Sequence, residues 1–280
     1  MGFSDRQTKM LEEMGIRVWT RPEPALVPEP EPITALPAAM PPRALRPGAA
    51  PVPAPEPEPT SAPMVSRQAE VPVRMSPVPE ASGSRPTGVE TMDWPALRDA
   101  VASCTACRLC EGRTQAVFGV GHERAHWMIV GEAPGEQEDR QGEPFVGKSG
   151  QLLDNMLRAV GLTREAESPE RQVYIANTLK CRPPFNRNPE PQELAQCEPF
   201  LVRQIAMVQP RVILAMGRFA VQSLLRSAEP IGRLRGRVHV YEGVPLVVTY
   251  HPAYLLRNPE DKGRAWDDLC LAREILEAAG

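Results

Sequence analysis

From about residue 93 to its end, the chain alternates short apolar runs with longer amphipathic stretches. The apolar runs 125–130, 171–176 and 211–215 predict strands, and the runs 238–241 and 246–249 predict a hairpin or a hairpin plus a fourth strand. The stretches 93–103, 147–160, 190–208, 217–226 and 262–279 have helical spacing of apolar positions. Strands that alternate with helices of this length predict a three-layer α/β/α fold around a central, mostly parallel four-stranded sheet.

Three polar loops follow strands of this sheet. They read GEAPG (131–135), NTLKCRPPFNRNP (177–189) and YHPAYLLRNP (250–259). In open α/β sheets, ligands bind outside the carboxyl ends of the strands. We therefore expect Glu132, Asn177 and His251 to lie on one rim of the sheet.

The first loop and its continuation to residue 157 combine many glycines with carboxylates. A phosphate cradle is the first hypothesis, because glycine loops that lead into helices bind anions. The glycine spacing matches neither common phosphate-binding pattern. Glu132, Glu136, Glu138 and Asp139 would also repel a phosphate. The loop must therefore serve a different ligand.

The segment before residue 90 has a different composition. Of the 33 prolines in the chain, 19 lie between Pro22 and Pro86. Such a stretch buries too little apolar surface to offset its ordering entropy, so residues 21–89 are expected to form a disordered linker. Residues 1–20 have near-helical spacing and predict either a frayed terminal helix or a docking helix for a protein partner. Residues 90–280 are expected to form a single domain.

Charge and hydropathy narrow the class of protein. The net charge is −3, and residues 90–280 contain 23 basic and 25 acidic side chains, which argues against a broad electrostatic grip on nucleic acid. Local basic clusters remain available for that purpose. No apolar run is long enough to span a membrane, and the first twenty residues lack a secretory pattern, so we expect a cytoplasmic protein.

Six cysteines suggest metal chemistry, because a cytoplasmic chain keeps its thiols reduced. Cys104 and Cys107 form a C-x-x-C pair, and Cys181 and Cys197 are the other candidate ligands. Three interpretations remain open at this point: unliganded thiols, tetrahedral zinc, or an iron–sulfur cluster with widely split ligands. Cys110 forms a second C-x-x-C with Cys107, and Cys270 is expected in the core.

Four motifs together resemble one known family. CTACRL (104–109), GEAPGEQEDRQGEPFVGKSGQLL (131–153), NTLKCRPPFNRNP and YHPAYLLRNP occur in the order found in the family 4 uracil-DNA glycosylases. The resemblance covers the chain from about Cys104 onward. It implies a DNA-repair enzyme that flips uracil out of single- or double-stranded DNA and hydrolyses its N-glycosidic bond. It also implies a 4Fe–4S cluster, whose ligand pattern falls on Cys104, Cys107, Cys181 and Cys197.

The resemblance also assigns a uracil pocket. Gly131, Glu132 and Ala133 are expected to line it, and Phe145 is expected to stack on the flipped base. Asn177 is expected to pair with uracil N3–H and O4.

The chemistry is assigned in the same way. His251 is expected to donate a hydrogen bond to uracil O2 as negative charge develops there. Glu138 is expected to orient water or stabilise the oxocarbenium-like sugar, and Glu132 is a further catalytic candidate. Residues 131–135 contain no aspartate, which leaves the general base open.

Contacts to DNA outside the pocket are expected from Leu255 or Leu256 as a wedge in the base stack, with Arg257 and Arg182 beside it. A monomer in a bacterial cytoplasm, associated with the nucleoid, fits this picture. Two other functions remain open: a non-catalytic iron–sulfur module that binds DNA within a repair or replication complex, and a glycosylase for another deaminated base.

Overall fold

The computed structural model of this chain describes residue 13 and residues 85–278. The expected helical segment 1–20 and linker 21–89 lie outside the described residues, apart from Glu13 and residues 85–89. Along the described residues, no helix is both long and apolar enough to cross a membrane.

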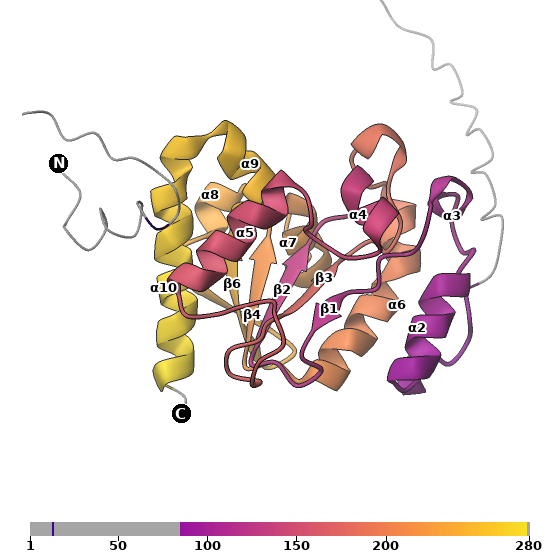
Figure 1. Cartoon of the computed structure of the whole chain (residues 1–280), viewed down its shortest axis with the longest axis horizontal. Helices are drawn as coiled ribbons and strands as arrows, with labels where there is room; N and C mark the ends of the chain where they lie inside the picture. Colours follow the sequence, from indigo (N-terminus) through magenta and orange to yellow (C-terminus); the bar gives the residue numbers. More distant parts are fainter. Residues whose placement is uncertain (1–12, 14–84, 279–280) are drawn as a thin grey trace, which may run out of the picture. The chain divides into compact units, whose positions relative to one another are not determined.

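The described residues form an α/β fold around one six-stranded sheet (Figure 1). The strands are β1 (Val120–Gly121), β2 (Trp127–Gly131), β3 (Tyr174–Asn177), β4 (Val212–Met216), β5 (Val238–Tyr241) and β6 (Val244–Thr249), in the spatial order β1-β3-β2-β4-β6-β5. The four central strands are parallel, as expected, and β1 and β5 add antiparallel edges. The expected count of four strands is therefore corrected to six. Strand β1 is only two residues long and leaves no alternating pattern in the sequence.

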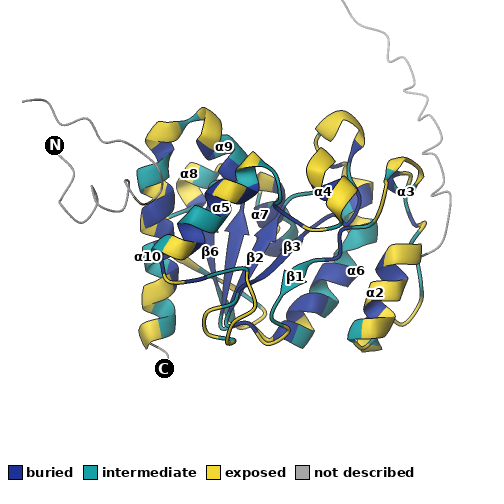
Figure 2. Ribbon diagram, in the orientation of Figure 1, coloured by how far each residue is buried: buried dark blue, intermediate teal, exposed yellow. Residues whose placement is uncertain are grey.

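Helices cover both faces of the sheet, which confirms the three-layer arrangement. One face carries α5 (Lys148–Ala159), α9 (Pro252–Arg257) and α10 (Lys262–Ala278), and the other carries α6 (Pro191–Val208), α7 (Arg218–Leu225) and α8 (Ile231–Leu234). In β2, Ile129 packs into the first layer, and Met128 and Val130 pack into the second. The central strands are buried on both faces, as Figure 2 shows.

Shorter elements complete the fold. They are the 3₁₀ turn η1 (Val89–Thr91), which packs against α6, then α2 (Trp94–Ser103), α3 (Leu109–Gly112), α4 (Glu136–Gln141) and η2 (Pro184–Asn186), and finally η3 (Pro259–Asp261), which lies between α9 and α10. Helix α2 begins at a capping residue, because Asp93 Oδ1 accepts a hydrogen bond from Ala96 N at 3.0 Å. Val89 is buried with Leu97 of α2 and Phe200 of α6, so the fold includes residues before Glu90.

Candidate active site

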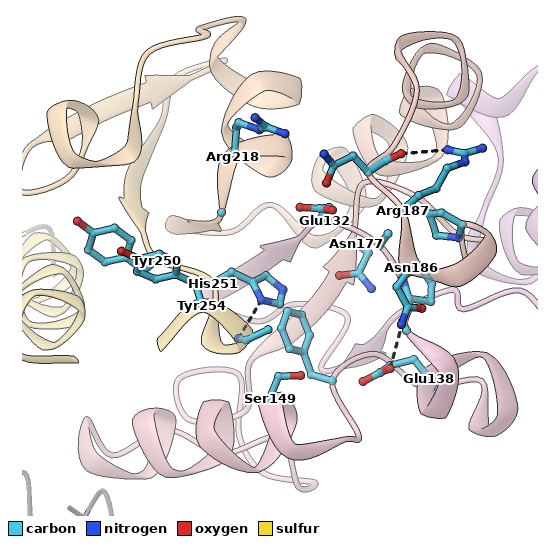
Figure 3. A pocket seen from close by; sticks show the side chains of 18 of the residues that line it. Glu132, Glu138, Ser149, Asn177, Asn186, Arg187, Arg218, Tyr250, His251 and Tyr254 are labelled. Carbon is cyan, nitrogen blue, oxygen red and sulfur yellow. Dashed lines mark hydrogen bonds between the residues drawn. The ribbon is translucent and has the colours of Figure 1, made fainter. Parts of the chain in front are cut away.

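The carboxyl ends of the parallel strands meet at one rim, as the sequence predicted. Gly131 lies beside Asn177 in the β2–β3 register, and Met216 lies beside Thr249 in the β4–β6 register. A pocket of about 780 Å³ opens at this rim (Figure 3). Among the residues expected at the site, those that line it are Glu132, Ala133, Glu138, Phe145, Asn177, His251 and Arg257.

Asn177 supplies an unpaired polar atom at this site. Its side chain is buried, and its Oδ1 has no hydrogen-bond partner among the described residues. A buried acceptor left without a partner is costly, which indicates that a ligand completes it. The main-chain oxygen of Asn177 accepts from the buried Lys180 Nζ at 2.9 Å, and this amine also donates to Gln204 Oε1 at 2.6 Å. The backbone beneath the amide is thereby fixed.

Gly131 lies under the pocket and has to be glycine for steric reasons. A Cβ atom there would lie 2.3 Å from Asn177 Oδ1 and 2.6 Å from Phe145 Cζ. Gly131 was expected to line the pocket; it is not among the lining residues, and it contributes a close approach of its backbone to two side chains that are.

Phe145 is held in an unusual backbone conformation. Its φ is +55°, and its ring stacks on the imidazole of His251 with centroids 5.2 Å apart and an interplanar angle of 27°. Arg164 Nη2 donates to the main-chain oxygen of Phe145 at 2.8 Å. Gly150 makes the close approach of α5 possible, because a Cβ atom there would lie 1.7 Å from that same oxygen. The position of the ring is therefore fixed by contacts within the protein.

His251 is poised as a neutral hydrogen-bond donor. Its Nδ1 accepts from Ala253 N at 3.1 Å, which places the proton of the neutral ring on Nε2. Burial lowers the pKa of His251 to about 4, with a smaller lowering from Arg257 and an opposing effect of Glu138. At neutral pH the ring is uncharged and presents an Nε2–H group.

Glu138 secures the loop that carries Phe145. Its Oε1 accepts from Val146 N at 3.1 Å and Gly147 N at 3.3 Å, and its Oε2 accepts from Gly135 N at 3.1 Å. A carboxylate has about four acceptor positions, so these three bonds leave room for one more donor, such as a water molecule.

The backbone of Glu132 is hydrogen-bonded to the residues that follow β3, and the pKa of its side chain is raised. Its main-chain oxygen accepts from Thr178 Oγ1 at 2.5 Å and from Leu179 N at 3.1 Å. Burial raises the pKa of the Glu132 carboxyl, and the charge of Arg218 partly offsets this effect.

The four residues expected to contact DNA outside the pocket differ in how far they are exposed and in whether they line the pocket; they are Leu255, Leu256, Arg257 and Arg182. Leu255 belongs to α9 and is fully buried in the core, because the helical phase turns it inward, so the wedge expected from Leu255 or Leu256 is wrong for Leu255. Leu256 is 45% exposed and Arg257 lines the pocket. Arg182 Nε donates to Asn186 Oδ1 at 2.9 Å and so supports the loop after β3.

Several pocket residues were given no individual role from the sequence, although most of them lie in the loops 131–135, 177–189 and 250–259 that were expected at the rim. They are Pro134, Gly135, Ser149, Pro183, Asn186, Arg187, Asn188, Gly217, Arg218, Ile231, Gly232, Tyr250, Ala253 and Tyr254. Gly217 and Arg218 directly follow β4, so the strand-end rule already applied to the other three strands would have found them.

A second cluster of reactive side chains lies beside α3 and α6. Five thiols border one small cavity, together with Arg113 and Lys180; they belong to Cys104, Cys107, Cys110, Cys181 and Cys197. Arg113 Nη1 donates to Cys181 Sγ at 3.0 Å, and Lys180 N donates to Cys197 Sγ at 3.2 Å. The four expected ligands are thus brought together, and Cys110 lies with them.

The chemistry of these thiols fits a cationic metal group. Burial raises the pKa of Cys107 to about 11 and that of Cys197 to about 12. Thiols of this kind stay protonated unless positive charge stabilises their thiolates. Within the described part of the chain, no three His, Cys, Asp or Glu side chains are arranged to hold a single metal ion. Cysteine thiolates, as found around this cavity, are the ligands that hold iron–sulfur clusters.

Comparisons with known proteins agree with the site. Residues 118–270 match the uracil DNA glycosylase superfamily. The chain is 44% identical over 168 residues to a type-4 uracil-DNA glycosylase of Archaeoglobus fulgidus, a match that covers 57% of this chain and 81% of the relative. It is 40% identical over 188 residues to the type-4 enzyme of Thermotoga maritima, covering 66% of this chain and 95% of the relative. A type-5 uracil-DNA glycosylase of Thermus thermophilus is 31% identical over 214 residues, which cover 64% of this chain and 94% of the relative. This chain belongs to the uracil DNA glycosylase superfamily, and within it to the type-4 uracil-DNA glycosylases.

Proposed function

We propose that this protein removes uracil from DNA by hydrolysing the bond between uracil N1 and deoxyribose C1′, which leaves an abasic site. The observation that carries the proposal is the buried, unpaired Oδ1 of Asn177 in the same pocket as the neutral, Nε2-protonated ring of His251. The two side chains come from the ends of different strands and offer complementary hydrogen bonds.

Recognition follows from the pattern of donors and acceptors. Uracil presents a donor at N3 and acceptors at O2 and O4, so Asn177 Oδ1 accepts from N3–H and its amide nitrogen donates to O4. Cytosine has the opposite pattern at N3 and C4 and would leave both Asn177 groups without partners. Phe145 lies against His251 and offers a ring face on which the flipped base stacks.

The hydrolysis needs stabilisation of charge on both sides of the breaking bond. The electron pair of the C1′–N1 bond stays on uracil, and His251 Nε2–H donates to O2 as that oxygen becomes negative. A water molecule adds its oxygen to C1′ and loses a proton, which balances the negative charge of the departing uracil. Glu138 has one remaining acceptor position for that water, and its carboxylate favours the positive sugar. Glu132, with its raised pKa, is a further candidate for proton transfer.

The cysteine cavity is assigned to a 4Fe–4S cluster held by Cys104, Cys107, Cys181 and Cys197. Bound there, the cluster would supply positive charge to the buried thiolates and cross-link the α3 segment, the loop after β3 and α6. That loop also carries Pro183 to Asn188, which line the uracil pocket. The cluster is therefore expected to support the pocket wall.

Partners and location follow from the activity. Uracil-containing DNA is the substrate, and a cytoplasmic, nucleoid-associated monomer is the form that suits it. Residues 21–89 would tether residues 1–20, which would be available to dock on another protein.

The direct test is base release from oligonucleotides that each contain one modified position. Substrates with uracil, hypoxanthine, xanthine or thymine are incubated with the full-length protein and analysed for free base and for alkali-labile sites. We expect release of uracil. A protein that binds these strands and releases nothing would be a binding module, and release of another base without uracil would indicate a glycosylase of different specificity.

A further inference from the structure

The loop between β3 and α6 carries a phenylalanine that the catalytic site does not use. Phe185 is 99% exposed. The large apolar side chains that are exposed among the described residues are Phe185, Val238, Val240 and Leu256. Val238 and Val240 belong to the edge strand β5. Phe185 and Leu256 instead belong to the two segments that flank the uracil pocket.

These two segments form opposite walls of the pocket. One wall is formed by Pro183, Asn186 and Arg187. The other is formed by Tyr250 and by the α9 residues Ala253, Tyr254 and Arg257. Figure 3 shows Asn186 and Arg187 on one side and Tyr250 and Tyr254 on the other, with Asn177 and His251 between them. Pro184 borders a separate surface hollow of about 510 Å³ beside α3 and α6. Phe185 therefore stands on the ridge between that hollow and the uracil pocket.

The backbone of this ridge is strained, and it is held firmly. Phe185 has φ +54° and Asn186 has φ +55°, a left-handed conformation that asparagine tolerates and a bulky ring disfavours. Arg182 Nε fixes Asn186 Oδ1 at 2.9 Å, and Arg187 binds both carboxylate oxygens of the buried Glu193, at 2.9 and 2.5 Å. Strained residues persist where the surroundings over-determine them, and they concentrate at functional positions.

We propose that Phe185 stacks on an unpaired base that neighbours the flipped uracil in the same DNA strand. The inference rests on the proposed function, since a strand that delivers uracil to Asn177 has to pass over one or both walls of the pocket. An exposed aromatic ring on the rim offers that strand a stacking surface that accepts any base. Because a duplex keeps the neighbouring bases paired, Phe185 favours single-stranded substrate.

The test uses full-length protein and oligonucleotides that carry 2′-fluoro-2′-deoxyuridine, whose fluorine opposes cleavage by destabilising positive charge at C1′. Affinity is measured for wild type, Phe185→Ala, Phe185→Trp and Phe185→Gly. Val240→Ala is the matched control, because Val240 is an exposed apolar residue on β5. We expect Phe185→Ala and Phe185→Gly to bind single strands about five- to a hundredfold more weakly, with a smaller loss on duplex. Phe185→Trp and Val240→Ala are expected to bind as wild type does.

Two further readouts separate stacking from a structural role. Glycine adopts positive φ without strain, so Phe185→Gly should have a Tm no lower than wild type while its DNA affinity falls. With 2-aminopurine on the 5′ or the 3′ side of the uracil, the complex with Phe185→Ala should be brighter than the wild-type complex at one of the two positions.

Wild-type affinity of Phe185→Ala would overturn the proposal, as would an equal loss on single strands and duplex or unchanged fluorescence at both positions. A change of oligomeric state with unchanged DNA affinity would instead assign Phe185 to a protein interface. Uracil release by wild type is measured in parallel. If it is absent, the proposed function fails as well; if it is present, these outcomes overturn the role of Phe185 alone.

Discussion

At the scale of single residues, the protonation state of His251 determines whether the pocket can stabilise negative charge on the base without repelling a positive sugar. A neutral ring with its proton on Nε2 can donate a hydrogen bond without repelling the positive sugar, and burial keeps the ring neutral. The backbone N–H of Ala253 enforces this tautomer.

The ring of His251 should titrate at about pH 4 and be Nε2-protonated at pH 7. A histidine in the unfolded chain titrates near 6.5, so the unfolded state binds more protons between about pH 4 and 6.5. Stability contributed by the neutral ring is therefore present above about pH 6.5 and lost as the pH falls toward 4. Nitrogen-15 NMR of the imidazole measures the pKa of His251 and shows which ring nitrogen carries the proton at pH 7. The spectrum of His251→Ala identifies the resonances of this ring. A ring that becomes protonated near pH 6.5 would contradict this assignment.

Asn177 should set specificity for the base. Asn177→Asp keeps an acceptor for N3–H and loses the donor to O4, so uracil excision should fall and weak cytosine excision should appear. Excision is measured on matched oligonucleotides with uracil or cytosine at one position. Asn186→Asp serves as a control on the pocket wall. Unchanged uracil excision by Asn177→Asp would place this side chain outside base recognition.

At the scale of elements, thiols from three segments that are distant in sequence border one cavity. Cys104 and Cys107 flank the turn before α3, Cys181 follows β3, and Cys197 lies in α6. Serine at any of Cys104, Cys107, Cys181 and Cys197 should remove bound iron and the brown colour, and should lower the Tm. Cys110→Ser and Cys270→Ser should retain four irons per chain. Iron analysis together with visible absorption tests this prediction. If Cys110→Ser loses the colour and Cys104→Ser keeps it, then Cys110 is the cluster ligand and Cys104 is not.

The sequence predicted the elements that have a regular apolar pattern and missed those that depend on three-dimensional fit. Strand β5 was predicted with its observed bounds, and β2 to within about two residues. Helix α9 was not predicted, so the sequence did not distinguish the buried Leu255 from the exposed Leu256. The left-handed backbone of Phe145 depends on Arg164 and Gly150, whose contacts with it no local pattern reveals.

The strand-end rule placed Glu132, Asn177 and His251 at one rim because it depends only on topology. It carries no information on where side chains point or on which loops fold over the rim. The rule placed the loop 177–189 at the rim, but it did not show that Pro183 and Asn186 to Asn188 fold over the pocket as a wall.

At the scale of the whole molecule, the catalytic part should begin near residue 85. Arg85 Nη1 donates to Gln196 O at 3.4 Å, and Val89 is buried. A protein of residues 85–280 should release uracil from naked oligonucleotides as the full chain does. A shorter protein of residues 93–280 is the control; it loses the burial of Val89, which is worth about 1.5–3 kcal/mol, and should unfold at a lower temperature. Lost activity in a folded 85–280 protein would assign a catalytic role to residues 1–84.

The central claim is that His251 stabilises the departing uracil in a pocket that Asn177 makes specific. Single-turnover cleavage by His251→Ala, measured beside its affinity for an uncleavable uracil strand, tests it most directly. His122→Ala is the matched control, because His122 Nδ1 also accepts a backbone N–H two residues ahead, from Arg124 at 3.0 Å, and lies outside the residues that line the pocket. A hydrogen bond that strengthens with developing charge is worth about 2.7–4 kcal/mol in the barrier, so His251→Ala should cleave about a hundred- to a thousandfold more slowly at nearly unchanged affinity. Wild-type cleavage with weakened binding would place His251 in DNA contact and contradict the claim.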